Sequence, residues 1–167
     1  MIKRLAILAA LAAALRLTGL LPFETKDVAA LKPVEALVVS MEDGQIVLDG
    51  GECQGRGDTW EEALEDLRKG AAGDLFLGTA EQVLLCSGTW ELLPQMVKND
   101  ALRPAAVVCA CPSGIVEPEE AAAYLAAHNA GMTLQRVHAV LLRGETVKLP
   151  VLQETKGGLR LYGAEDR

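Results

Sequence analysis

The stretch from Ala105 to Cys111 is the feature that most constrains the fold. It is almost continuously apolar. A strand with one face in water alternates apolar and polar residues, so a continuous apolar run is typical of a strand that is covered on both faces. Pro112, Ser113 and Gly114 then end the run. The run therefore predicts an interior strand of a sheet that carries other elements on both of its faces.

Strand patterns precede and follow that run. Residues 34–41 and 45–48 flank Asp43-Gly44, and Asp-Gly between two apolar runs is a strong hairpin signal because glycine accepts a positive φ. The glycines within residues 50–57 indicate a loose loop, in which residues 52–54 could continue the ladder. Further strands are expected at residues 75–77 and 82–86, as one strand or as two that pivot at Gly78, and at 148–154 and 159–162, which form a second hairpin.

Helical patterns lie between these strands. Thr59 and Glu62 form a capping box, in which each side chain satisfies a backbone N–H at the start of a helix over residues 59–69. Trp60 and Leu67 share one apolar stripe of this helix, and we expect both to be buried against the sheet that contains Val107. Other helices are expected at residues 89–99, where Pro94 is unfavourable, at 117–130 and at 133–142. The order predicts an α/β or α+β fold, a mixed β-sheet covered by helices and preceded by an N-terminal hydrophobic helix.

The N-terminal residues have the pattern of an exported protein. Lys3 and Arg4 precede an apolar run over residues 5–15, the length of a signal-peptide core. Extended through Arg16 to residue 23, the run would span about 28 Å as a helix, close to the hydrocarbon thickness of about 30 Å. We expect residues 1–26 to be an uncleaved anchor with its basic end inside; a cleaved signal peptide and a buried helix are the alternatives. The expected anchor residues are Leu5, Leu8, Leu11, Leu15, Leu17 and Leu20.

Charge excludes some classes of partner for residues 27–167, the predicted single extracytoplasmic domain. The chain has a net charge of -7, although residues 1–26 carry four basic side chains against one acidic one. The domain is therefore strongly acidic, which argues against nucleic acid and against flat binding to anionic lipid. The apolar leader, and not charge, is expected to hold the protein at a membrane.

Residue types that carry chemistry are few and scattered. Cys109 and Cys111 lie on the same face of the expected strand, an arrangement that suits half a metal site, a redox pair or, as we favour, core packing. His128 and His138 fall on separate predicted helices, and no nucleophile or phosphate-loop motif is present. We predict no catalytic, cofactor-binding or metal-binding residues and no enzymatic activity. The disulfide state of Cys53, Cys86, Cys109 and Cys111 is not readable from their spacing.

Several motifs in order resemble one known family. Leu17-Thr18-Gly19 occupies the place of a lipobox, and Asp43-Gly44 closes a first hairpin. The segments 57–63, 75–78 and 83–86 are similar to the family's helix and its lysine-leucine-phenylalanine-phenylalanine-glycine strand. Residues 98–104 are similar to its arginine-aspartate, then arginine, junction. On these motifs the chain resembles the N-terminal domain of the Ger(x)C spore-germination proteins, the lipoprotein C subunits of germinant receptors.

The resemblance implies a function and also shows two departures. It implies a receptor-assembly or accessory role in spore germination, with membrane-embedded A and B receptor subunits as partners and a location on the extracytoplasmic face, the inner spore membrane in a sporulating host. Leu20 stands where the family has its lipid-bearing cysteine. The matched region is also less than half of a usual family member. The alternative function is an extracytoplasmic small-ligand binder or enzyme unrelated to germination.

The C-terminal hairpin is the expected contact surface. Residues 148–162 resemble the segment where the family passes into its next domain, which would leave apolar side chains uncovered here. We expect this hairpin to bind a receptor partner or a second copy in a homodimer, because exposed apolar patches usually mark contacts. The expected partner-binding residues are Leu149, Val151, Leu159 and Leu161.

Overall fold

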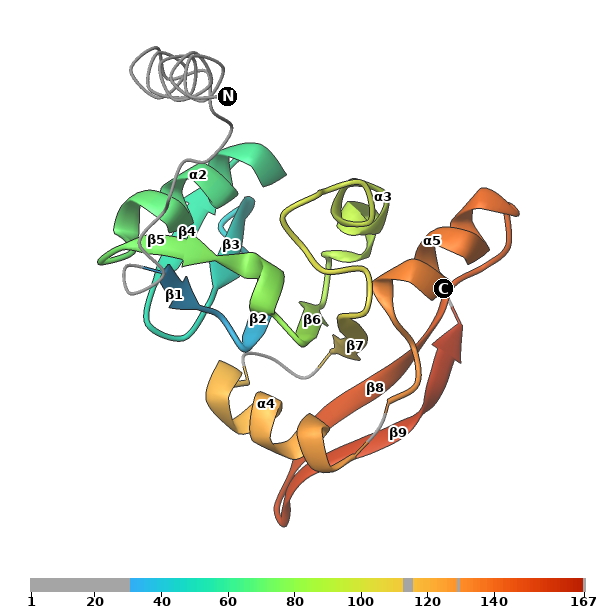
Figure 1. The fold of residues 1–167 in the computed structure, drawn as a ribbon. Coiled ribbons are helices and arrows are strands. Elements are labelled where there is room, and N and C mark those ends of the chain that lie inside the picture. Colours follow the sequence, from blue (N-terminus) through green and yellow to red (C-terminus); the bar gives the residue numbers. More distant parts are fainter. Residues whose placement is uncertain (1–30, 113–115, 129, 167) are drawn as a thin grey trace, which may run out of the picture. The chain divides into compact units, whose positions relative to one another are not determined.

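The computed structural model describes residues 31–112, 116–128 and 130–166, and the predicted anchor lies outside them. These residues form a mixed α+β fold, as expected, with a seven-stranded sheet in the order β4-β3-β2-β6-β7-β8-β9 (Figure 1). The strands are β1 (Leu31–Pro33), β2 (Ala36–Glu42), β3 (Gln45–Asp49), β4 (Gln54–Gly57), β5 (Asp74–Phe76), β6 (Gln82–Cys86), β7 (Val107–Cys111), β8 (Lys148–Thr155) and β9 (Gly158–Asp166). The helices are α2 (Trp60–Gly70), α3 (Leu93–Met96), α4 (Pro118–Ala127) and α5 (Leu134–Leu142).

Four parallel strands form the middle of the sheet. β2, β6, β7 and β8 run parallel, while β3 and β4 on one side and β9 on the other pair antiparallel. The N-terminal half of β7 has a different neighbour: the Val108 N–H donates to the Met132 carbonyl at 2.8 Å, and the Leu134 N–H donates to the Ala106 carbonyl at 2.9 Å. The predicted interior strand is thus confirmed, with the segment entering α5 paired along part of it.

The first hairpin follows from two residues. Asp43 and Gly44 have φ values of 51° and 85°, the left-handed pair that a tight primed turn requires. The hairpin continues into β4, which pairs with β3 from Ile46 opposite Gly57 to Asp49 opposite Gln54. The loop expected at residues 50–57 is therefore partly wrong, because its second half is a strand.

The glycines of β4 are explained by the helix that packs on them. A Cβ on Gly55 would lie 2.2 Å from the backbone nitrogen of Leu67, and one on Gly57 would lie 2.5 Å from that of Ala63. Helix α2 therefore approaches β4 more closely than any side chain permits. These glycines indicate helix–strand contact and not looseness.

Helix α2 begins at the predicted cap, but only half of the expected capping box forms. The Glu62 N–H donates to the Thr59 hydroxyl at 3.2 Å, as predicted, whereas the Glu62 carboxylate accepts the N–H of Asp58, at 3.0 Å, and not that of Thr59. The stripe that includes Trp60 and Leu67 is buried, as expected. The sheet on which they pack is the one that contains Val107, as expected, and Val107 itself packs on its opposite face.

The helix expected at residues 89–99 is much shorter than predicted. A 3-10 turn over Trp90–Leu92 leads into α3, which has only four residues and carries Pro94 in its first turn. Proline is accepted there because the first-turn N–H groups need no intrahelical partner. Pro94 is therefore compatible with the first turn of α3, which follows the 3-10 turn directly.

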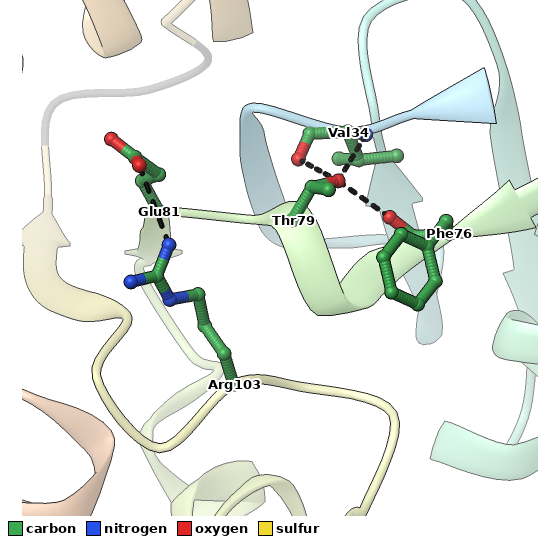
Figure 2. A network of polar contacts seen from close by, with 5 residues as sticks. All are labelled: Val34, Phe76, Thr79, Glu81 and Arg103. Carbon is green, nitrogen blue, oxygen red and sulfur yellow. Dashed lines mark hydrogen bonds and ion pairs between the residues drawn. The ribbon is translucent and has the colours of Figure 1, made fainter. Parts of the chain in front are cut away.

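A polar cluster lies where the chain leaves the small sheet of β1 and β5 (Figure 2). The Thr79 hydroxyl accepts the Val34 N–H at 3.0 Å and donates to the Phe76 carbonyl, 2.7 Å away. Beside it, the Arg103 guanidinium pairs with the Glu81 carboxylate at 3.3 Å. Gly78 is indeed the pivot between two strands, although the pairing of β5 with β1 has no signal in the sequence.

The sheet has two differently filled faces. One face packs against α2, α3 and α5 and is built of large side chains, among them Trp60, Leu37 and Met96. The other face packs against α4 and contains Cys86, Cys109 and Cys111 with small alanines of the helix. Both faces of β7 are covered, as its continuous apolar sequence requires.

Candidate functional site

The predicted contact hairpin exists, but its apolar residues do not form a surface. Leu149, Val151 and Leu159 are only 0%, 9% and 8% exposed, and Leu161 is partly buried. Leu149 and Val151 of β8 belong to one core, and Leu159 and Leu161 of β9 pack in the other. The expectation that these four side chains are uncovered is therefore wrong. Tyr162, 45% exposed, is the large apolar side chain that the hairpin does present.

The outer edge of the hairpin is the feature that remains available. β4 and β9 are the two edge strands of the seven-stranded sheet. On β4, the Arg56 N–H donates to the Asp66 carboxylate of α2 at 2.9 Å. On β9, the Leu161 N–H donates to the Tyr124 hydroxyl of α4 at 3.1 Å. Each edge is thus partly satisfied by a helix side chain, but β9 spans nine residues against four in β4.

The Tyr124 side chain is itself held by its own helix. The rings of Tyr124 and His128 stack with centroids 4.1 Å apart and planes 13° from parallel. A ring nitrogen of His128, Nδ1, lies 2.8 Å from the Tyr124 carbonyl oxygen, so that nitrogen carries the donated proton. These two contacts hold the His128 ring against Tyr124 at the C-terminal end of α4.

A cleft of about 520 Å³ lies between α3 and α5. Met96, Leu102 and Leu134 supply apolar lining, and Asn99, Asp100 and His138 supply polar groups. The side-chain oxygen of Asn99, Oδ1, already accepts a hydrogen bond from the Ala101 N–H at 2.9 Å. The cleft is large enough for a small molecule, and it places His138 with residues of the family-like junction at 98–104, a grouping that the sequence did not indicate.

Three of the four cysteines lie together on the α4 face of the sheet. Cys86 on β6 is the register partner of Cys111 on β7, and Cys109 follows on the same face of β7 opposite Leu84. The shared face of Cys109 and Cys111 confirms the sequence prediction, whereas the place of Cys86 beside them was missed. Cys53 lies in the other core.

The environment of these thiols sets their acidity in opposite directions. A hydrogen bond from the Cys111 thiol lowers the pKa of Cys86, and the same bond, together with burial, raises the pKa of Cys111. Burial raises the pKa of Cys109 to about 12. Burial, followed by the nearby Asp49 and Glu52 carboxylates, raises the pKa of Cys53. Cys86 is thus the thiol of this row that gives up its proton most readily.

The thiol pair lies where the chain changes sides of the sheet. After β6 the chain passes to α3, which packs on the large-side-chain face, and after β7 it passes to α4, which packs on the other face. Cys86 and Cys111 are the last residues of these two strands. In open sheets of parallel strands, ligand and catalytic sites form at such points, beyond the carboxyl ends of the strands.

Comparison with protein-family models, with curated proteins and with solved structures finds no match. Within the described ranges, no set of three or more His, Cys, Asp or Glu side chains is arranged to hold a metal ion. None of the helices formed by residues 31–166, apart from the segments left undescribed, has the length and apolar character needed to cross a membrane.

Proposed function

We propose that this chain is a membrane-tethered accessory protein of the germinant-receptor C type, which acts by protein contact during receptor assembly. The observation that carries the proposal is the placement of the family-like motifs. They fall on the β2–β3 turn, the start of α2, the β5–β6 segment and the residues before β7. Three of these places adjoin β2, β3, β6 or β7, which are neighbours in the large sheet, whereas α2 packs on β4 and β3 and β5 belongs to the small sheet.

The contact surface in this proposal is the edge of β9. Its residues offer a longer backbone edge than β4, and an extended segment of another protein can add to such an edge by main-chain hydrogen bonds. Lys156 and Arg160 are exposed beside this edge, with Glu154 as their acidic neighbour. The turn end of the hairpin is therefore locally basic in an acidic domain.

The charge of the turn suits an acidic occupant. An extended acidic segment of a receptor subunit would meet Lys156 and Arg160 with opposite charge. We therefore assign the edge to an acidic, extended segment of a membrane-embedded receptor subunit of the A or B type. A homodimer through β9 is the competing outcome.

Photocrosslinking in host membranes tests this assignment with the full chain. A photoreactive residue at Arg160 should crosslink to a polytopic receptor subunit, and one at Glu120, exposed on α4, should not. Arg160→Glu should reduce the crosslinked product from a reporter at Tyr162 at least tenfold. The matched charge reversal Arg68→Glu, exposed on α2, should leave it unchanged.

Other crosslinking results would overturn the proposal. Products from Glu120 alone, a product of two copies of this chain, or a monomer without partner would each contradict the β9 assignment. A gene position away from genes for polytopic, permease-like subunits would contradict the receptor role itself.

The tether is tested separately. Residues 5–23 are proposed to hold the protein at the membrane without lipid, since Leu20 replaces the acylated cysteine. Membrane fractionation with fatty-acid labelling should find the chain in membranes and unlabelled. Incorporated label, or a soluble processed form, would contradict this.

A further inference from the structure

We propose that Cys86 and Cys111 are a dithiol site that closes reversibly to a disulfide, with a low-molecular-weight disulfide as the oxidant. The site is distinct from the β9 edge and does not depend on the function proposed above. It is assigned from the relation of two strands, and not from the presence of cysteine alone.

The backbone already places the two residues for bonding. Cys86 and Cys111 are direct partners in the parallel register of β6 and β7, and both side chains belong to the α4-face core. Neighbouring strands are about 4.8 Å apart, within the range of about 4.4–6.8 Å between the Cα atoms of disulfide-bonded residues. The two thiols are also hydrogen-bonded to each other. Closing the bond thus needs rotation of side chains and no movement of strands.

The other thiols lack this relation. Cys109 faces the same core, but its register partner on β6 is Leu84, and it lies two residues from Cys111 on the same extended strand. Cys53 belongs to the core on the opposite face of the sheet. The register therefore selects one pair from four cysteines.

The two sulfurs differ in exposure and in acidity, and this difference assigns each a role in disulfide formation. Cys86 retains 5% exposure at the end of β6, where the exposed Ser87 and Gly88 follow, whereas Cys111 is fully buried. The hydrogen bond from Cys111 lowers the pKa of Cys86, so Cys86 is also the better source of thiolate. Cys86 is thus the attacking thiol and Cys111 the resolving thiol.

The reaction balances as two exchanges. The Cys86 thiolate attacks one sulfur of a small disulfide RSSR, which forms a Cys86–SR mixed disulfide and releases RS⁻. Cys111 then loses its proton and attacks Cys86 Sγ, which forms the Cys86–Cys111 bond and releases a second RS⁻. Both leaving thiolates take up the protons lost by the two cysteines, so two protein thiols and RSSR give one protein disulfide and two RSH.

Peptide mapping of the full chain tests the pairing without any mutation. Reduced protein is exposed to oxidised glutathione, alkylated under native conditions, and digested. We expect two of the four thiols to disappear and a disulfide to join the peptide containing Cys86 to that containing Cys109 and Cys111. We also expect Tm to rise by about 3 °C or more, because the bond closes the loop from β6 to β7, and to return when dithiothreitol is added.

Alanine variants separate the roles and the neighbouring thiol. Cys111→Ala should accumulate glutathione on Cys86, Cys86→Ala should accumulate none, and Cys109→Ala and Cys53→Ala should still form the bond. A bond that persists in Cys111→Ala, a bond to Cys53, an intermolecular bond, or four thiols that react only after denaturation would each overturn the proposal. If a variant fails to fold, fragmentation of the disulfide-linked wild-type peptides between Cys109 and Cys111 decides which of the two is bonded to Cys86.

Discussion

The two faces of the central sheet differ in what covers them and in the size of the side chains they bury. Three helices, α2, α3 and α5, cover one face, and the largest fully buried side chain, Trp60, lies there. The other face is covered by α4 through Ala121, Ala122 and Leu125, and its sheet side chains include three cysteines. Because hydrophobic stabilisation scales with the apolar area removed from water, we infer that the first face carries most of the folding free energy. The second face is covered by α4 and contains the cysteine thiols.

Gly55→Ala should produce the largest loss of stability. Its Cβ would meet the Leu67 nitrogen at 2.2 Å and the Ala63 carbonyl oxygen at 2.4 Å, and backbone atoms cannot move aside as a flexible side chain can. Displacing α2 would uncover the large-side-chain core, so we expect a loss of about 4 kcal/mol or more in the free energy of unfolding. Urea denaturation measures it.

A matched glycine provides the control for this prediction. Gly157 has no atom within 4 Å of an added Cβ and has no positive φ. Gly157→Ala should therefore change stability by less than about 0.5 kcal/mol. Equal effects of the two substitutions would show that α2 does not pack on β4 as described.

Trp60→Ala tests the contrast between the faces directly. Removing a fully buried tryptophan should cost about 3–5 kcal/mol, and Leu125→Ala on the α4 face should cost about 2–3 kcal/mol. Glu61→Ala, one residue along on the exposed side of α2, should have almost no effect. A larger loss from Leu125 than from Trp60 would reverse the proposed ranking of the two faces.

Several elements of the two faces could be predicted from the sequence, namely those that a single local pattern determines. The apolar stripe of α2, its Thr59 cap and the Asp43-Gly44 turn each act within a few residues, and each prediction was confirmed. The apolar run to Cys111 likewise indicated a strand covered on both faces. The two α-helices after β7 were also found near their expected bounds.

Contacts between residues that are far apart in the chain could not be predicted from the sequence. Gly55 and Gly57 resemble loop glycines unless the helix lying on them is known. The partnership of Cys86 with Cys111 depends on the register between two strands joined by a long crossover, which no local pattern specifies. The hairpin leucines were misjudged for a related reason: both faces of β8 are covered, so their apolar character reflects burial and not an uncovered surface.

Alkaline pH should weaken the thiol-bearing face. Burial raises the pKa of Cys109 from 9.0 to about 12, so between these values the unfolded chain has lost a proton that the folded chain retains. Stability is therefore complete below pH 9 and falls as pH rises above it, by up to about 1.4 kcal/mol per pH unit for one such group. Denaturation under reducing conditions from pH 8 to 10.5 measures the slope.

Cys109→Ala identifies the group responsible. The substitution should reduce that slope even though it lowers stability at every pH by leaving a small cavity. The slope, and not the absolute stability, is the relevant quantity. An unchanged slope would assign the alkaline loss to other groups.

Apart from the control variants, the smallest effect is expected from Tyr124→Phe, which removes a side-chain hydrogen bond between α4 and the β9 edge. The substitution keeps the aromatic ring against His128 but removes the hydroxyl that accepts the Leu161 N–H at 3.1 Å. Because this bond is only partly buried, water can replace the lost acceptor, and we expect a loss of about 0.5–1.5 kcal/mol. The equivalent change on the other edge, Asp66→Ala, removes the acceptor of the Arg56 N–H and should cost a similar amount. The two variants should differ in hydrogen exchange, since amide protection should fall at Leu161 in the first and at Arg56 in the second. Loss of protection across all of β9 in Tyr124→Phe would show that this single contact, and not the apolar packing of α4, holds the cover on the thiol-bearing face.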